Sequence, residues 1–254
     1  MPVITIKFVY YKVIKGFIYI NIFTLLFFIQ ICMAQNTDSC NPYRLNLIKT
    51  TDQYQQQFAV HGHGFADLKV HIPSLILDLI YCSSKNFTNQ QLYPPIVTSY
   101  LQEPAADALK RIQEQLLEEG LSLKIWDAYR PYQVSRKMWA VVPDARYAAD
   151  PAIGSGHNRG IAVDLTIVAV NTGKELDMGT EFDNFTEKAH HDFTTLPKNV
   201  LTNRMKLRKL MEAHGFRALE TEWWHYYWSK GHYELMDFTF EELEEICKQP
   251  YNNK

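Results

Sequence analysis

The sequence has no surplus of positive charge and few cysteines, which argues against two broad classes of protein. Its 26 lysines and arginines are outnumbered by 28 acidic residues, so the formal net charge is −2. Nucleic-acid-binding domains present a strongly basic surface, so we expect no nucleic acid as a partner. The 4 cysteines lack the spacing of a zinc finger. A chain of 254 residues, 46% of them hydrophobic, suits one ordinary globular domain.

The N-terminal stretch lacks acidic residues and has the layout of a secretory signal peptide. Three lysines precede the apolar run Phe17–Ile31, and small residues end that run before a cleavage point preceding Gln35. We therefore predict a signal peptide over residues 1–34 and a single domain over residues 35–254. Such a leader predicts a location in the periplasm or outside the cell.

Two other interpretations of this stretch are less favoured. The apolar run is short for a membrane anchor and no charged stop follows it, so we expect no stable membrane insertion after cleavage. A lipoprotein cut before Cys32 is disfavoured because Gln30 and Ile31 are not the small residues that such a site prefers.

Three cysteines remain after cleavage, namely Cys40, Cys82 and Cys247. An odd number in an exported protein allows at most one disulfide bridge and leaves a thiol over. The pairing stays open, with Cys40–Cys82 as our hypothesis.

Periodic patterns predict both strands and helices. Apolar or alternating runs predict strands at Leu75–Cys82, Leu121–Ile125 and Ile161–Val170. Helical spacing of apolar residues predicts helices at Glu103–Glu119 and Leu201–His214, each with a glycine just past its end. Thr239–Glu242 has the pattern of a capping box that opens a final short helix.

The stretch Ser155–Thr166 offers two side chains that can bind a metal, His157 and Asp164. Asp164 falls within the predicted strand, on the face opposite Val163 and Leu165. A carboxylate beside large apolar residues is costly to bury unless it is paired or binds a cation. A third ligand must come from elsewhere in the chain, and His225 is the best candidate.

The surroundings of His225 permit two interpretations. Trp223 and Trp224 are consistent with a histidine that simply packs in the core. Glu222, three residues before it, favours a functional site, because a buried carboxylate needs a partner. Two histidines and one aspartate around zinc leave a fourth position for water, as in a catalytic site.

That set of residues predicts metal-assisted hydrolysis of an amide. Zinc lowers the pKa of a bound water toward neutrality. Glu222 is placed to take a proton from water and pass it to the leaving amine. Arg130, at the exit of a predicted strand, is placed to stabilise an oxyanion. The spacing alone leaves open whether Arg130 instead forms a structural ion pair with Asp127.

These residues form a pattern that resembles a known family. The patterns Ser155-x-His157-x-x-Gly160-x-Ala162-x-Asp164 and Glu222-x-Trp224-His225 resemble the zinc D-alanyl-D-alanine dipeptidases of the VanX type. Those enzymes belong with the zinc D-Ala-D-Ala carboxypeptidases and share a fold with the hedgehog signalling domain. Three further motifs occur in the family's order, namely Asp78-Leu79-x-Tyr81, Asp127-Ala128-Tyr129-Arg130-Pro131 and Met178-Gly179-Thr180-x-Phe182-Asp183.

The resemblance implies a fold and a set of roles. The fold is α+β, with a central antiparallel sheet, packed helices and zinc in a groove. One Zn²⁺ per chain is implied, with His157, Asp164 and His225 as ligands. Glu222 is implied as general base and acid, and Arg130 as the residue that stabilises the transition state. Asp183 is implied to hold the ammonium group of the substrate, and Ser155 to help bind the substrate.

The implied activity is hydrolysis of D-alanyl-D-alanine to two D-alanines, linked to peptidoglycan turnover. The alternatives are a zinc D,D-carboxypeptidase or endopeptidase acting on wall peptides, and a non-catalytic zinc domain that binds a partner. The chain departs from the family near Asp78, where it has Ile80, Cys82 and Ser83. That departure leaves the exact dipeptide preference open.

Overall fold

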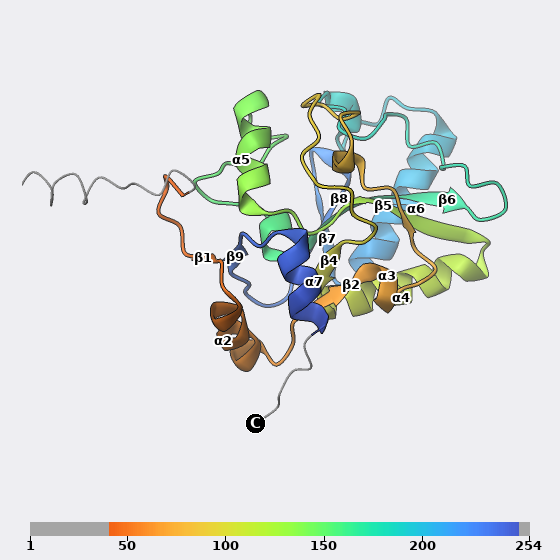
Figure 1. Cartoon of the computed structure of the whole chain (residues 1–254). Coiled ribbons are helices and arrows are strands. Elements are labelled where there is room, and N and C mark those ends of the chain that lie inside the picture. The colour runs from red at the N-terminus through yellow and green to blue at the C-terminus, as the bar shows by residue number, and fades with distance from the viewer. Residues whose placement is uncertain (1–40, 249–254) are drawn as a thin grey trace, which may run out of the picture. The chain divides into compact units, whose positions relative to one another are not determined.

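The computed structural model describes residues 41–248 and is built on a five-stranded sheet (Figure 1). In spatial order its strands are β3 (Ile76–Leu77), β5 (Leu121–Asp127), β6 (Ala162–Ala169), β8 (Glu222–Trp228) and β7 (Phe216–Leu219). Neighbouring strands are antiparallel except β3 and β5, which are parallel. The predicted α+β fold is confirmed, with one parallel pair at the edge of its antiparallel sheet.

Further strand pairs, helices and 3₁₀ turns accompany this sheet. Two further strand pairs are β1 (Leu47–Ile48) with β9 (Leu235–Met236), and β2 (Phe65–Asp67) with β4 (Tyr100–Gln102). The helices are α2 (Thr51–His61), α3 (Leu68–His71), α4 (Glu103–Glu118), α5 (Tyr132–Val141), α6 (Lys198–Ala213) and α7 (Phe240–Lys248). Single 3₁₀ turns are η1 (Ile80–Cys82), η2 (His157–Arg159) and η3 (Glu187–Ala189).

Helix α4 packs against the sheet with the apolar face that its sequence predicts. Ala105, Leu109, Ile112 and Leu116 are fully buried, in one cluster with Leu165 of β6. Burying each leucine or isoleucine side chain contributes roughly 1.5–3 kcal/mol. Helix α6 contacts α4, β7 and β8. The two helices therefore support the strands that carry the site described below.

The prediction of a strand over Leu75–Cys82 is mostly wrong. Only Ile76–Leu77 pairs with β5, and the chain then turns through η1. The turn is closed by hydrogen bonds from the Cys82 amide to the Leu79 carbonyl (3.1 Å) and from the Ser83 amide to the Ile80 carbonyl (3.3 Å). It buries Tyr81 inside an aromatic cluster. Tertiary packing therefore overrides the strand preference of this apolar run.

The capping box predicted at Thr239–Glu242 is confirmed. The Glu242 carboxylate accepts from the Thr239 amide (2.7 Å), and the Thr239 hydroxyl accepts from the Glu242 amide (3.2 Å). A second capping box, which the sequence patterns did not predict, opens α2 with Thr50 and Gln53. In both cases side chains satisfy amides that the first helical turn leaves free.

Some sequence predictions fall beyond the described range. The signal peptide at residues 1–34 and Cys40 of the hypothesised bridge lie outside the described residues. Within residues 41–248, Cys82 and Cys247 are free thiols. In that same part of the chain, no helix has both the length and the apolar character needed to cross a membrane.

Gly160 occupies a backbone position where a side chain does not fit. Its φ is +65°, and an added Cβ would lie 2.1 Å from Cε1 of Phe65. Gly173 has a similar φ of +66°, but nothing lies within 4 Å of an added Cβ.

Alanine at Gly173 should cost about 1 kcal/mol of folding stability, for the left-handed backbone alone. Alanine at Gly160 should cost about 3 kcal/mol, because overpacking adds to that term. Urea unfolding of both variants measures the difference, and equal losses would refute the steric argument.

Candidate active site

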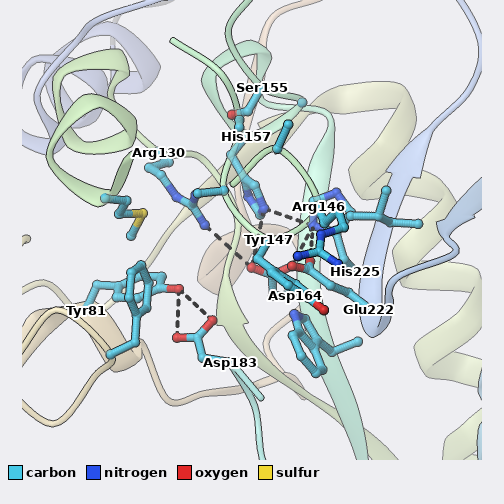
Figure 2. A pocket seen from close by; sticks show the side chains of 18 residues that line it. Tyr81, Arg130, Arg146, Tyr147, Ser155, His157, Asp164, Asp183, Glu222 and His225 are labelled. Atoms are coloured by element: carbon cyan, nitrogen blue, oxygen red, sulfur yellow. Dashed lines mark hydrogen bonds and ion pairs between the residues drawn. The ribbon is translucent and has the colours of Figure 1, made fainter. Parts of the chain in front are cut away.

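Three potential metal ligands converge between β6, β8 and η2. Asp164 and His225 are directly opposed partners in the antiparallel β6–β8 pair, so their side chains lie on the same face. Nδ1 of His225 lies 2.8 Å from Oδ1 of Asp164. Nε2 of His157 lies 3.3 Å from Oδ2 of Asp164 and 3.3 Å from Nδ1 of His225. Figure 2 shows these side chains pointing toward one another. We call His157, Asp164 and His225 the His–Asp–His trio.

The donor set of the trio fits a zinc ion. Nδ1 of His157 lies 2.6 Å from the Ala128 carbonyl oxygen, which only accepts, so this nitrogen carries the proton. In the neutral imidazole, Nε2 of His157 then carries a lone pair that faces the Asp164 carboxylate, and two such acceptors at 3.3 Å repel unless a cation lies between them. Ligand atoms around tetrahedral zinc are separated by roughly 3.3 Å, given zinc–ligand distances of about 2.0–2.1 Å. The hydrogen bond to Ala128 is the kind of contact that orients a histidine ligand.

Glu222 lies beside the trio without joining it. It is the first residue of β8 and is buried, and its Oε2 is 3.8 Å from Nδ1 of His225. Burial raises the pKa of the Glu222 carboxyl well above its usual range, and the carboxylates of Asp164 and Asp183 raise it further. A carboxyl group whose pKa is raised holds a proton more readily than an ordinary glutamate, which suits a residue that takes up and delivers a proton.

Arg130 forms the ion pair with Asp127 that the sequence left open, and its side chain also faces the trio. Its Nε and one terminal nitrogen lie 2.8 and 2.6 Å from Oδ2 of Asp127, which is a buried ion pair. The same terminal nitrogen lies 3.6 Å from Oδ2 of Asp164, so the guanidinium also faces the trio. The hydroxyl of Tyr93 donates to the other oxygen of Asp127 at 2.7 Å. Asp127 and Tyr93 therefore hold Arg130 in place, and no local pattern pointed to Tyr93.

Asp183 faces the site from a strained backbone position. Its φ of +57° is unusual for a residue other than glycine. The hydroxyl of Tyr81 donates to its two carboxylate oxygens, at 3.2 and 3.1 Å. Burial raises the pKa of Asp183 to about 8, and the Asp164 carboxylate adds to the shift. An ammonium group against Asp183 would stabilise its ionised form. In the sequence, Tyr81 was singled out only as part of a motif. The structure shows that it lies in the turn η1 and contacts Asp183.

Ser155 lies in the wall of the site, two residues before His157. Its amide donates to Oδ1 of Asn158 (2.9 Å), and its hydroxyl accepts from the Asn158 amide (3.2 Å). The side-chain amide of Asn158 donates in turn to the Arg130 carbonyl (2.8 Å). Asn158 thus links the loop of Ser155 to the strand exit that carries Arg130, a role that its place in the sequence did not suggest.

One cavity of about 210 Å³ contains all seven predicted site residues in its wall. They are Arg130, Ser155, His157, Asp164, Asp183, Glu222 and His225. The volume is below the range of about 300–1,000 Å³ that is usual for sites of drug-sized ligands. The arrangement therefore suits a small polar ligand beside a bound cation.

Comparisons with known proteins point to a single family. Residues 61–243 match the model of peptidase family M15 that is described as D-ala-D-ala dipeptidase. A D-alanyl-D-alanine dipeptidase of Escherichia coli (strain K12) is 36% identical over 160 residues, covering 63% of this chain and 82% of the relative. One from Enterococcus faecium is 32% identical over 187 residues, covering 65% and 90%. A solved structure of the LdcB LD-carboxypeptidase shows 20% identity and a TM-score of 0.34, with 54% of this chain and 64% of that chain covered.

The family match spans most of the chain and includes every residue of the cavity wall that the sequence predicted. This match agrees with the family resemblance that was inferred from the five sequence motifs. The chain belongs to the D-Ala-D-Ala dipeptidase family of M15 peptidases.

Proposed function

We propose that this chain is a zinc-dependent dipeptidase that hydrolyses D-alanyl-D-alanine to two D-alanines. The observation that carries the proposal is the convergence of the His–Asp–His trio, Glu222 and Asp183 on one small cavity. The dipeptidase relatives in the same family support the choice of substrate. The predicted signal peptide supports a place in the periplasm or outside the cell, in a single mature domain, where the reaction serves peptidoglycan turnover.

In the proposed reaction, separate residues hold the metal, transfer the proton and stabilise the negative charge. His157, Asp164 and His225 would hold one zinc ion, which when bound activates a water molecule and polarises a carbonyl group. Glu222 takes the proton of the attacking water and delivers it to the leaving amine. Arg130, held by Asp127, stabilises the negative charge that develops on the carbonyl oxygen.

Asp183 would set the length of the substrate. Its carboxylate, bonded to Tyr81, is placed to meet the free ammonium group of a dipeptide. A peptide whose amine is acylated brings no charge to that position, so the buried carboxyl would lose its partner. Ser155, in the wall near His157, would contribute a hydroxyl contact to the substrate.

The experiment that tests the proposal measures D-alanine release by the purified, zinc-loaded mature protein. Its substrates are D-Ala-D-Ala, the N-acetylated dipeptide, and a pentapeptide that ends in D-Ala-D-Ala. Release from the free dipeptide alone is expected. Release from the blocked or longer peptides would instead identify a carboxypeptidase, and zinc binding without any release would identify a non-catalytic domain.

Asp183→Asn is expected to raise KM for the free dipeptide by about 10–100-fold, because a hydrogen bond to a charged group is lost. The inhibition constant of the N-acetylated dipeptide should change little, since that ligand has no ammonium group. Glu181→Gln is the matched control, because Glu181 is exposed, lies two residues away and is not part of the cavity wall. Equal losses for both ligands would count against the ammonium contact.

A further inference from the structure

A free dipeptide carries a carboxylate at the end opposite its ammonium group, and that charge also needs a partner. Three carboxyl groups already line the cavity, on Asp164, Asp183 and Glu222. A substrate carboxylate placed beside these groups would be strongly disfavoured without a cationic partner of its own. Among the described residues of the wall, the arginines are Arg130 and Arg146.

Arg130 is not available for this task. It is buried, its nitrogens lie 2.6 and 2.8 Å from Oδ2 of Asp127, and it faces Asp164 at 3.6 Å. In the proposed reaction it serves the carbonyl oxygen at the bond that is cut. Arg146 is therefore the arginine of the wall that remains for the carboxylate of the substrate.

The backbone of Arg146 is anchored beside the catalytic strand. Arg146 lies in the loop between α5 and η2, and its carbonyl accepts from the Thr221 hydroxyl at 2.8 Å. Thr221 directly precedes Glu222 in the sequence. This contact connects the position of Arg146 to the start of β8, although the loop itself has no regular structure.

The side chain of Arg146 contacts an aromatic ring that is itself part of a stack. Its guanidinium carbon lies 5.2 Å from the ring centre of Tyr147, and Tyr147 stacks on Phe185 at 5.2 Å. Phe185 follows Asp183 by two residues, so this stack joins the Arg146 loop to the loop that carries Asp183. In the view of Figure 2, Asp183 is drawn beside Tyr81, and Arg146 is drawn near His225 and Glu222.

The present partner of Arg146 is exchangeable. Oδ1 and Oδ2 of Asp144 accept from Nε and from a terminal nitrogen of the Arg146 guanidinium, at 3.0 and 2.6 Å, and Asp144 is not part of the cavity wall. The Arg146 side chain is 63% exposed, and exposed ion pairs contribute little to stability. A substrate carboxylate offers the guanidinium the same forked geometry as Asp144.

We propose that Arg146 binds the C-terminal carboxylate of the substrate, opposite the ammonium subsite at Asp183. The inference rests on the proposed dipeptidase function and adds a second charge requirement to it. Asp183 selects a free N-terminus, and Arg146 selects a free C-terminus. Together the two residues restrict the cavity to zwitterionic dipeptides.

The test pairs a change in the enzyme with the matching change in the substrate. Steady-state kinetics are measured for wild type, Arg146→Gln and Arg217→Gln, on D-Ala-D-Ala and on its C-terminal amide. Arg217 is exposed on β7 outside the cavity, so its variant controls for the loss of one positive charge. Arg146→Gln should raise KM for the free dipeptide by about 10–100-fold and leave KM for the amide unchanged. Arg217→Gln should change neither value.

Two results would overturn the inference. One is an equal loss on both substrates, which would make Arg146 a structural residue. The other is no loss on the free dipeptide, which would place its carboxylate elsewhere. A wild-type protein without activity on the free dipeptide would refute the dipeptidase proposal itself, and the wild-type measurement shows this separately from the variants.

Discussion

Glu222→Gln is expected to abolish hydrolysis and leave zinc bound. Glu222 is buried and its carboxyl lies 3.8 Å from His225, outside the His–Asp–His trio. Glutamine keeps the size of the side chain but cannot take a proton from water. Loss of general base and acid catalysis should lower kcat by on the order of 10²–10⁴-fold. D-alanine release and zinc content, measured by elemental analysis on the same sample, check both halves of this prediction.

A neighbouring glutamate provides the matched control. Glu220 is exposed and pairs with Arg208, and it lies outside the cavity wall. Glu220→Gln should therefore retain full kcat and full zinc content. If the Glu222 variant kept wild-type kcat, Glu222 would not be the base. If it lost zinc together with activity, Glu222 would belong to the metal site.

His157→Ala is expected to lose both zinc and activity. His157 is buried, and alanine removes the nitrogen that faces Asp164 and His225 at 3.3 Å. Two ligands remain, which is fewer than the three protein ligands typical of a catalytic zinc site. Elemental analysis should find close to one zinc per wild-type chain and little in the variant.

The melting temperature gives a second readout that does not depend on activity. A ligand that binds only the folded state stabilises it, so a chelator should lower the Tm of the wild-type protein. The chelator should leave the Tm of His157→Ala unchanged, because that variant has no zinc to lose. His232→Ala is the control, since the His232 side chain is 82% exposed and lies outside the cavity wall. A variant that still bound one zinc tightly would exclude His157 as a ligand.

Local sequence patterns predicted the elements that are stabilised by short-range hydrogen bonds or by one apolar face. The face Ala105–Leu116 of α4 and the capping box of α7 follow from helical spacing and from short-range hydrogen bonds. The run Leu75–Cys82 shows where this logic fails. Its apolar residues satisfy a strand pattern, but the aromatic cluster around Tyr81 favours a 3₁₀ turn.

Some residues of the candidate site could likewise be predicted from local patterns, and others could not. His157 and Asp164 were found from a short motif, because a carboxylate on an apolar strand needs a partner. The pairing of Asp164 with His225 depends on the register of β6 against β8, which joins residues 61 positions apart. Arg146 lies in an irregular loop without any periodic pattern, so only its position in the cavity wall reveals it.

The sequence by itself determined the order of the motifs, the types of chemically active side chains and hence the family of this protein. Those properties are local, because they depend on residue identity and short spacing. Only the tertiary structure decided which side chains meet, including Tyr81 with Asp183, Tyr93 with Asp127, and Arg146 with the cavity. These contacts depend on strand register, loop paths and the packing of the whole core, and no short stretch of sequence encodes that packing.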